Sequence, residues 1–158
     1  MGRVQFFDGS GDEPSPPPGS FRVGASALVL DDAGRVLLQQ RRDNGLWALP
    51  GGAVDPGESV GAAAAREACE ETGYDVEPLY VVGVYSDPRH VFVYPGGEAR
   101  QEFVVCVACR LVGGALAVSE ESREVGWFTP SELEALTMHP RVRARIEDHL
   151  AGRRALLG

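Results

Sequence analysis

The chain has 158 residues, of which 44% are hydrophobic and 24% are charged, the composition of an ordinary soluble domain. Its formal net charge of −8 argues against a nucleic acid polymer as partner, because such binding depends on Lys and Arg displacing counterions from phosphates. No apolar run approaches the roughly 20 residues that span a bilayer. The sequence therefore excludes a membrane protein and leaves a small phosphate-bearing ligand open.

The cysteines and the N-terminal sequence indicate the cellular compartment of the protein. Cys69, Cys106 and Cys109 cannot all pair within one chain, and an odd number favours reduced thiols over a disulfide framework. The N-terminus lacks the continuous hydrophobic segment of a secretory signal. We therefore expect a cytoplasmic protein.

The first elements follow a segment rich in proline and glycine. Residues 1–20 lack periodicity and predict a flexible or extended arm, so we expect the folded domain to cover residues 21–158. Two short β-rich runs, Arg22–Leu30 and Val36–Gln40, are separated by Asp31-Asp32-Ala33-Gly34, whose residues suit a turn. The pattern predicts a hairpin.

The next segment combines a short strand with the clearest helix. Leu46–Leu49 predicts a strand that ends at Pro50-Gly51-Gly52, after which we expect a loop. Residues 58–72 lack proline, are rich in Ala and Glu, and are followed by Gly73, a residue that commonly ends helices in a left-handed conformation. These features predict a helix from Glu58 to Thr72.

The second half of the chain predicts further strands and two helices. The strands are expected at Leu79–Tyr85, Val91–Tyr94, Gln101–Val112 and Val125–Phe128, with Pro95-Gly96-Gly97 as a turn. Thr129-Pro130 is typical of a helix start, so one helix is expected through Leu136 and another over Pro140–Leu150. Five arginines near the C-terminus (Arg141, Arg143, Arg145, Arg153 and Arg154) fit a solvated helix face better than an anion site. Together these elements predict an α/β fold, with a mixed sheet and helices packed against it.

The helix over residues 58–72 concentrates negative charge on one side. At about 100° per residue, Glu67, Glu70 and Glu71 fall within an arc of about 100°. Arg66 can pair with Glu70 but leaves net negative charge. A solvated acidic face and a site for a divalent cation both remain open, and oxygen ligands favour Mg²⁺ or Mn²⁺ over zinc.

Small residues occupy the opposite side of this helix. Ala62, Ala65, Cys69 and Thr72 recur at helical spacing, which would let the helix lie close to the sheet. We therefore expect the acidic side to be the exposed side.

The segment GAVDPGESVGAAAAREACEETGY, from Gly52 to Tyr74, resembles the Nudix box. Every fixed position of that pattern is present, while Ala68 and Tyr74 replace the usual bulky aliphatic residues. The resemblance implies an α/β/α sandwich with a mixed sheet, and hydrolysis of a nucleoside diphosphate linked to another group.

The resemblance also implies roles for particular residues. Glu67, Glu70 and Glu71 would bind Mg²⁺ or Mn²⁺, together with a backbone carbonyl of Gly51 or Gly52. The expected roles of Arg66 and Glu58 are to orient the carboxylates. Water would attack phosphorus in line, so catalysis consists of positioning, charge neutralisation and activation of water.

The general base and the substrate contacts are less specific in the sequence. Glu67 is the first candidate for the base. Glu121, Glu124 and Glu102 are remote candidates, although acids in such positions are more often solvated surface residues. Candidate substrate residues are Arg41 and Arg89, as a phosphate clamp, and Trp47, which could stack on a base or belong to the core.

A small nucleotide, nucleotide sugar or nucleoside triphosphate is the expected partner, but its identity cannot be predicted. The alternative function is a Nudix module that senses a nucleotide without cleaving it. A homodimer also remains open.

Overall fold

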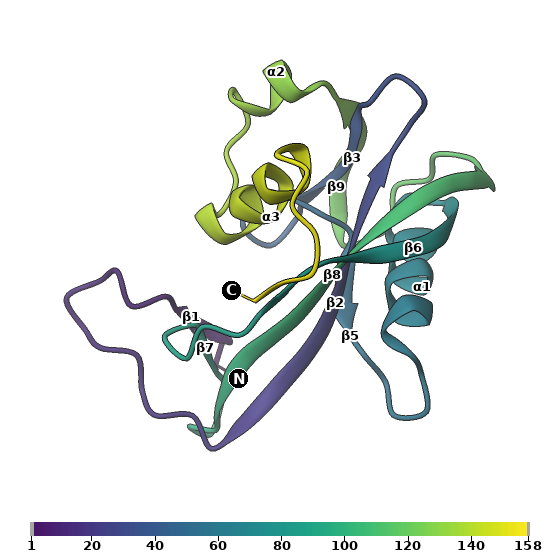
Figure 1. Ribbon diagram of the computed structural model, residues 1–158. Coiled ribbons are helices and arrows are strands. Elements are labelled where there is room, and N and C mark those ends of the chain that lie inside the picture. The colour runs from purple at the N-terminus through teal and green to yellow at the C-terminus, as the bar shows by residue number, and fades with distance from the viewer. Residues whose placement is uncertain (1, 158) are drawn as a thin grey trace.

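A ten-stranded mixed sheet forms the centre of the computed structural model, which describes residues 2–157. Helix α1 (Val60–Thr72) covers one face of the sheet and helix α3 (Pro140–Leu150) covers the other (Figure 1). The short helix α2 (Pro130–Leu133) lies beyond the end of β9. This arrangement confirms the α/β sandwich with a mixed sheet. No helix within residues 2–157 is both long enough and apolar enough to cross a membrane.

Two long strands running in parallel form the middle of the sheet. The strands are β1 (Gln5–Phe7), β2 (Ser20–Leu30), β3 (Val36–Arg41), β4 (Trp47–Ala48), β5 (Gly51–Ala53), β6 (Tyr74–Tyr85), β7 (Val91–Val93), β8 (Ala99–Gly114), β9 (Ser122–Phe128) and β10 (Leu156–Leu157). Strands β2 and β8 pair in parallel along the whole length of β2. The main path runs β1-β7-β8-β2-β3-β4, while β6 also pairs with β8, β5 with β2, and β9 with β3.

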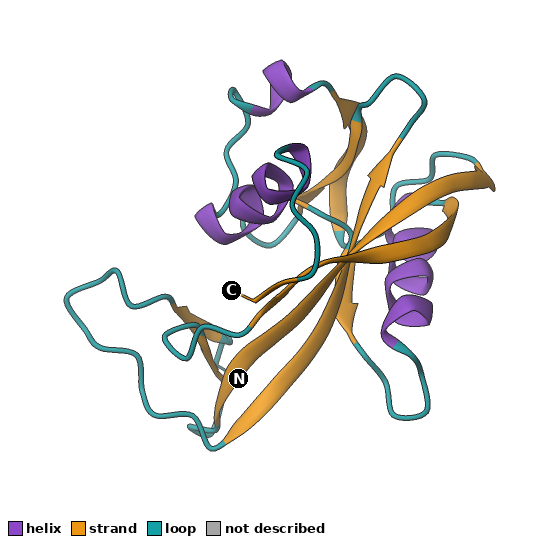
Figure 2. Ribbon diagram, viewed as in Figure 1, coloured by secondary structure: helices purple, strands orange, loops and turns teal. Residues whose placement is uncertain are grey.

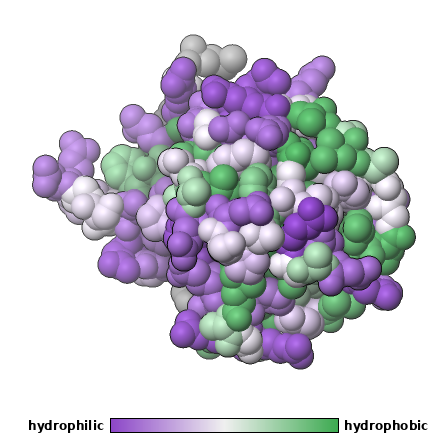
Figure 3. All heavy atoms as spheres, turned by 90° about the horizontal axis from the view of Figure 1, so that it is seen from above, coloured by the Kyte–Doolittle hydropathy of each residue, from purple (hydrophilic) through white to green (hydrophobic). Residues whose placement is uncertain are grey.

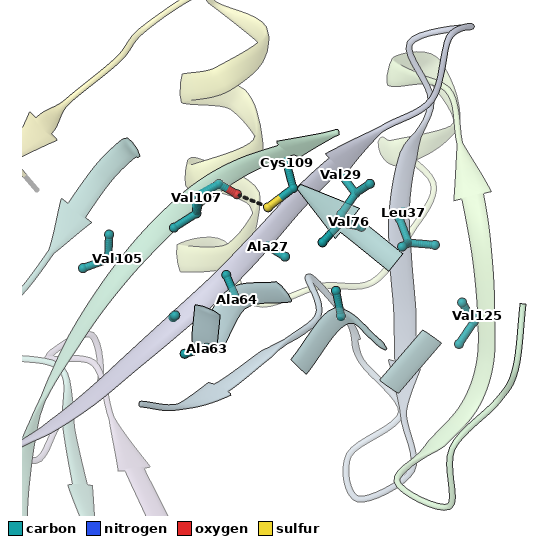
Figure 4. Close-up of a cluster of buried hydrophobic side chains, with 12 residues drawn as sticks. Ala27, Val29, Leu37, Ala63, Ala64, Val76, Val105, Val107, Cys109 and Val125 are labelled. Carbon is teal, nitrogen blue, oxygen red and sulfur yellow. Dashed lines mark hydrogen bonds between the residues drawn. The ribbon is translucent and has the colours of Figure 1, made fainter. Parts of the chain in front are cut away.

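The two faces of β2 serve two separate cores. Ala25, Ala27 and Val29 face α1, and Figure 4 shows this cluster with Ala63 and Ala64 of the helix. Leu28, which alternates with these residues, belongs to the second cluster, on the side of α3. The small alanines let α1 lie close to the sheet, so its side chains reach the strands directly.

The orientation of α1 differs from the prediction. Its buried residues are Ala63, Ala64, Ala68, Glu71 and Thr72, whereas Ala62 and Cys69 are exposed. The prediction placed the whole acidic side of the helix in solvent. Glu71 instead has a hydrogen-bond partner on β3, so its carboxylate is directed into the protein.

The predicted first hairpin is wrong in its pairing. Strands β2 and β3 are joined by the expected turn but pair only at Leu30 and Val36. Beyond that point β2 pairs with β8 and with β5, while β3 pairs with β9. Turn composition is a local signal and contains no information about these distant partners.

Other boundaries also differ. Strand β1 lies within residues 1–20 and pairs with β7, and residues 8–19 then form an extended loop (Figure 2). Gly51 and Gly52 belong to β5, so the predicted loop begins only after Ala53. Strand β6 starts at Tyr74, α1 starts after the N-cap Ser59, and α2 ends at Leu133. The predicted bounds of α3 are confirmed.

In the view of Figure 3 the molecular surface is neither uniformly hydrophilic nor uniformly apolar. Hydrophilic and apolar areas are interspersed there, with the apolar areas more frequent at the right of the view. Scattered exposed apolar residues are normal for a folded domain and identify no site by themselves.

Candidate active site

Two glycines bring the end of β5 unusually close to β2 and α1. A Cβ atom on Gly51 would lie 2.6 Å from the carbonyl oxygen of Ala25, and one on Gly52 would lie 2.4 Å from Oε1 of Glu67. No larger residue fits either position without a shift of backbone or carboxylate. The glycines therefore let the Glu67 carboxylate contact the backbone of β5.

Arg66 connects the loop before α1 with the carboxylates on the helix. Its Nε donates to Oε2 of Glu58 at 2.7 Å, and its Nη1 donates to Glu67 at 2.9 Å and to Glu70 at 3.3 Å. Its Nη2 also donates to the carbonyl oxygen of Ala53. The Arg66 guanidinium lowers the pKa of Glu58 to about 2, so Glu58 remains ionised at neutral pH. Arg66 thus fixes the positions of the acidic side chains and of the loop.

Glu71 occupies the most buried position among the three acids. Glu71 is 6% exposed, and its carboxylate accepts hydrogen bonds from the Gln39 amide and from the backbone N–H of Gly51. Gln39 accepts in turn from the Ser122 hydroxyl. Burial, followed by contact with Glu67, raises the pKa of Glu71 well above its ordinary value. The sequence contains no pattern that would have identified Gln39 as a partner of this carboxylate.

A cavity of about 850 Å³ collects most of the predicted acidic residues, and we call it the acidic cavity. It is lined by Arg22, Gln39, Arg41, Arg42, Asp43, Gly51, Gly52, Glu67, Glu70, Glu71, Ser119, Glu120 and Glu121. Of the remote base candidates, Glu121 lines this cavity, whereas Glu124 and Glu102 do not. Glu58 lies outside the lining and contacts it through Arg66.

A second cavity, of about 530 Å³, adjoins the first, and we call it the inner cavity. The two share Arg22, Arg41, Asp43, Gly51 and Gly52. The inner cavity is further lined by Val4, Phe6, Gly24, Ala25, Ser26, Asn44, Leu46, Trp47, Ala48, Leu49, Phe92, Tyr94, Glu102, Val104, His139, Arg141, Val142 and Arg145. Of the arginines that line the inner cavity, only Arg41 was predicted from the sequence as a substrate contact.

Of the three predicted substrate residues, two line a cavity and one does not. Arg41 lines both cavities and forms an ion pair with Asp43. Trp47 lines the inner cavity but is buried, with its ring edge-on to Phe128 at 4.8 Å between centroids. Arg89 is exposed, pairs with Asp87 and lies outside both linings.

The arginines of α3 contradict the expectation of a wholly solvated face. Arg145 is buried and Arg141 is half-buried, and both form ion pairs with Glu102. Helical spacing within α3 did not reveal these ion pairs, because their acidic partner lies on β8. A buried Arg with an acidic partner is held by long-range contacts that the helix sequence does not encode.

The chemistry of the acidic cavity suits a divalent cation, although the acids do not yet form a compact metal centre. Within residues 2–157 no group of three or more His, Cys, Asp or Glu side chains is gathered closely enough to hold an ion. However, the Glu67 carboxylate is close enough to Glu71 to raise the pKa of that group, and a bound cation would relieve the repulsion between the two side chains. The available donors are all oxygen atoms, the type that Mg²⁺ and Mn²⁺ prefer.

Comparisons with known proteins agree on one family. The family model of the NUDIX domain matches residues 20–150. A relative from Bacillus subtilis (strain 168), provisionally named an 8-oxo-dGTP diphosphatase, is 36% identical over 132 residues, covering 84% of this chain and 82% of its own.

Two solved structures resemble the whole domain. The MutT protein of Bacillus halodurans has a TM-score of 0.72 and 25% identity, with 87% of each chain covered. An ADP-ribose pyrophosphatase from Streptococcus suis 89-1591 has a TM-score of 0.68 and 25% identity, covering 87% of this chain and 98% of that one.

Proposed function

Because the chain belongs to the Nudix family and is a hydrolase of diphosphate bonds, we propose that it is a Mg²⁺- or Mn²⁺-dependent nucleotide pyrophosphohydrolase. Its substrate is a nucleoside diphosphate linked to a further group, and water attacks one of the two phosphorus atoms. The observation that carries this proposal is the acidic cavity, where Glu67, Glu70 and Glu71 meet the backbone of Gly51 and Gly52.

The cation would be held by the oxygen atoms of the acidic cavity. Glu67, Glu70 and Glu71 all line this cavity, the Glu70 side chain is 59% exposed, and a carbonyl of Gly51 or Gly52 would complete the donors. When bound, the ion neutralises diphosphate charge and lowers the pKa of a water molecule. Without it, the three carboxylates would repel the substrate.

The cationic side chains of the cavities orient the substrate. Arg22 and Arg41 line both cavities, so each can donate to a diphosphate that lies across their junction. Arg66 keeps Glu67 and Glu70 in position through direct hydrogen bonds, and Glu58 anchors Arg66 in turn. These contacts reduce the reorganisation that the carboxylates need during the reaction.

Two acids remain as candidates for the base that accepts the proton of the attacking water. Glu67 is the first, because its carboxylate lies against Gly52 and lines the acidic cavity. Glu121 lines the same cavity from the loop before β9. A base must lie within hydrogen-bond reach of the water it activates, which favours these two over Glu102 and Glu124.

The substrate is a small nucleotide. The names of the similar proteins refer to 8-oxo-dGTP and to ADP-ribose, both of which contain a diphosphate bond. The two cavities suit the two parts of such a molecule. The acidic cavity has carboxylates for a cation that binds the diphosphate, and the inner cavity has space for the rest of the nucleotide.

The proposal is tested by metal removal and restoration. A panel of nucleoside triphosphates, ADP-ribose and nucleotide sugars is incubated with the protein, and release of nucleoside monophosphate or phosphate is measured in EDTA and after adding Mg²⁺ or Mn²⁺. We expect activity to disappear in the chelator and to return with either ion. Unchanged turnover of a good substrate in excess EDTA would disprove the metal requirement.

A further inference from the structure

The inner cavity contains a buried charged cluster that hydrolysis of a diphosphate does not require. Glu102 on β8 accepts from Nη1 of Arg141 at 2.6 Å, and Nη2 of Arg145 lies 3.6 Å from the same carboxylate oxygen. We call these three residues the Glu102 cluster. All of them line the inner cavity and none lines the acidic cavity.

The Glu102 cluster has unused hydrogen-bonding capacity. Nε of Arg141 and Nε of Arg145 are buried and have no partner among residues 2–157. The second carboxylate oxygen of Glu102 makes no hydrogen bond within that range either, since Nδ1 of His90 lies 3.8 Å away. The two Nε atoms are closed to solvent, so a ligand in the inner cavity would instead bind Nη2 of Arg141, Nη1 of Arg145 and the free oxygen of Glu102. These outer guanidinium nitrogens also make no hydrogen bond within residues 2–157, which leaves donors and an acceptor for a ligand.

The arginines are held in place by aromatic rings. The Arg141 guanidinium lies over the ring of Phe6 at 4.0 Å from its centroid, and the Arg145 guanidinium lies over Tyr85 at 5.3 Å. Stacking on a ring face leaves the edge of a guanidinium, where its N–H groups are, available for hydrogen bonds. The donors are therefore oriented before a ligand arrives.

The charge balance of the Glu102 cluster selects the kind of ligand. Two guanidinium groups face one carboxylate, so donors exceed acceptors and the cluster has a net positive charge. A ring carbonyl, with two lone pairs, satisfies such donors, and an adjacent ring N–H satisfies the free oxygen of Glu102. An exocyclic amine in place of the carbonyl would direct its own N–H groups at the arginines.

We propose that the inner cavity binds a nucleobase that has a ring carbonyl beside a ring N–H. Arg141 or Arg145 donates to the carbonyl oxygen, and Glu102 accepts from the ring N–H. This inference rests on the proposed function, because it places the base beside a diphosphate bound at Arg22 and Arg41. It predicts selection of hypoxanthine and uracil over adenine and cytosine, which have an amine and an unprotonated ring nitrogen at the corresponding positions.

Two matched pairs of nucleoside monophosphates test the inference. IMP is compared with AMP, and UMP with CMP, because the bases of each pair differ only in this edge. Monophosphates contain no diphosphate bond, so their dissociation constants can be measured by calorimetry without turnover. We expect IMP and UMP to bind about 10-fold more tightly than their partners, the discrimination typical of such hydrogen bonds. Equal affinities within either pair, or tighter binding of AMP or CMP, would overturn the inference.

Variants connect the preference to the Glu102 cluster. Glu102→Gln removes the charge at nearly constant volume and should reduce each preference to less than about 3-fold. Glu98→Gln, at an exposed position next to the same strand, is the matched control and should retain the full preference. If circular dichroism shows that Glu102→Gln is unfolded, Arg145→Lys takes its place, because Lys keeps the charge but loses the planar fork. A full preference in a folded variant would overturn the assignment.

The result is separable from the test of the proposed function. Hydrolysis that depends on Mg²⁺ without any preference within the two pairs would reject the base selection and leave the hydrolase unaffected. A clear preference in a protein whose hydrolysis persists in EDTA would support the base selection and reject the metal requirement.

Discussion

Arg66 determines the electrostatic state of the acidic residues around it. It donates to Glu58, Glu67 and Glu70, and so offsets part of their mutual repulsion in the absence of a cation. A divalent ion bound by Glu67 and Glu70 would compete with the single Nη1 atom that contacts both. The two-centred contact with Glu58 is independent of that atom, because it uses Nε and Nη2.

Removing one negative charge at the proposed metal site should abolish most of the activity. We expect Glu70→Gln and Glu71→Gln each to lower kcat by about 10²-fold or more, because each carboxylate offsets phosphate repulsion through the cation. Glu134→Gln, at an exposed position after α2, serves as the control for net charge. Steady-state kinetics at saturating Mg²⁺ provide the measurement, with thermal melts to confirm folding. Near wild-type kcat in both folded variants would remove these residues from the metal site.

The ion pair between Glu58 and Arg66 predicts a defined loss of stability in acid. Because the pKa of Glu58 falls from 4.5 to about 2 on folding, its contribution is complete above pH 4.5 and disappears as the pH falls towards 2. Glu58→Gln should therefore lower the urea midpoint at pH 7 and flatten the loss of stability between pH 4.5 and pH 2. Parallel midpoint curves for wild type and variant across this interval would contradict the prediction, and Glu134→Gln again controls for charge.

At the scale of elements, both ends of α1 are fixed by specific contacts. The Ser59 side chain accepts from the backbone N–H of Ala62, and Gly73 ends the helix with a φ of +81°. A Cβ atom on Gly73 would also lie 2.2 Å from the carbonyl oxygen of Ala115. The start and end of the helix that carries the acidic residues are therefore set by one serine and one glycine.

Substitution of Gly73 should destabilise the protein, whereas the same change inside the helix should not. Gly73→Ala imposes a left-handed conformation on alanine and a clash with backbone, so we expect a loss of about 2 kcal/mol or more in the free energy of unfolding. At Gly61 a Cβ would meet Pro78 at an ordinary 3.5 Å, and Gly61→Ala should stabilise the helix by up to about 1 kcal/mol. Urea unfolding measures both, and equal effects of the two changes would contradict this account of the C-cap.

The elements also show which parts of the site could be predicted from sequence. The acids of α1 and the cap at Gly73 follow a fixed local spacing, so both were predictable. The burial of Glu71 was not, because it depends on Gln39, 32 residues earlier in the chain. The ion pair of Arg141 with Glu102 joins residues 39 positions apart, and no periodicity within α3 reports such a partner.

At the scale of the whole molecule, the two cavities separate charge neutralisation from recognition. The acidic cavity is lined mainly by α1, β3, β5 and the loop before β9, whereas the inner cavity is lined mainly by β1, β2, β4, β7, β8 and α3. Gly51 and Gly52 of β5 belong to both cavities, together with Arg22, Arg41 and Asp43, so these residues form the junction. Changes on the far side of the inner cavity should therefore affect binding more than chemistry.

Strand β1 offers the clearest test of this separation. It forms part of the wall of the inner cavity, although it lies outside the domain that the sequence predicts over residues 21–158. Phe6 contacts the rings of His90, Phe92 and His139 and supports Arg141. We expect Phe6→Ala to raise KM by about 10-fold and to change kcat by less than about 2-fold, since the lost contacts serve binding equally in the ground and transition states. Phe7→Ala removes the same ring from the adjacent position, which does not line the inner cavity, and should leave KM nearly unchanged. Steady-state kinetics on one good substrate distinguish the outcomes: a fall in kcat with constant KM in Phe6→Ala would place β1 in catalysis instead of recognition.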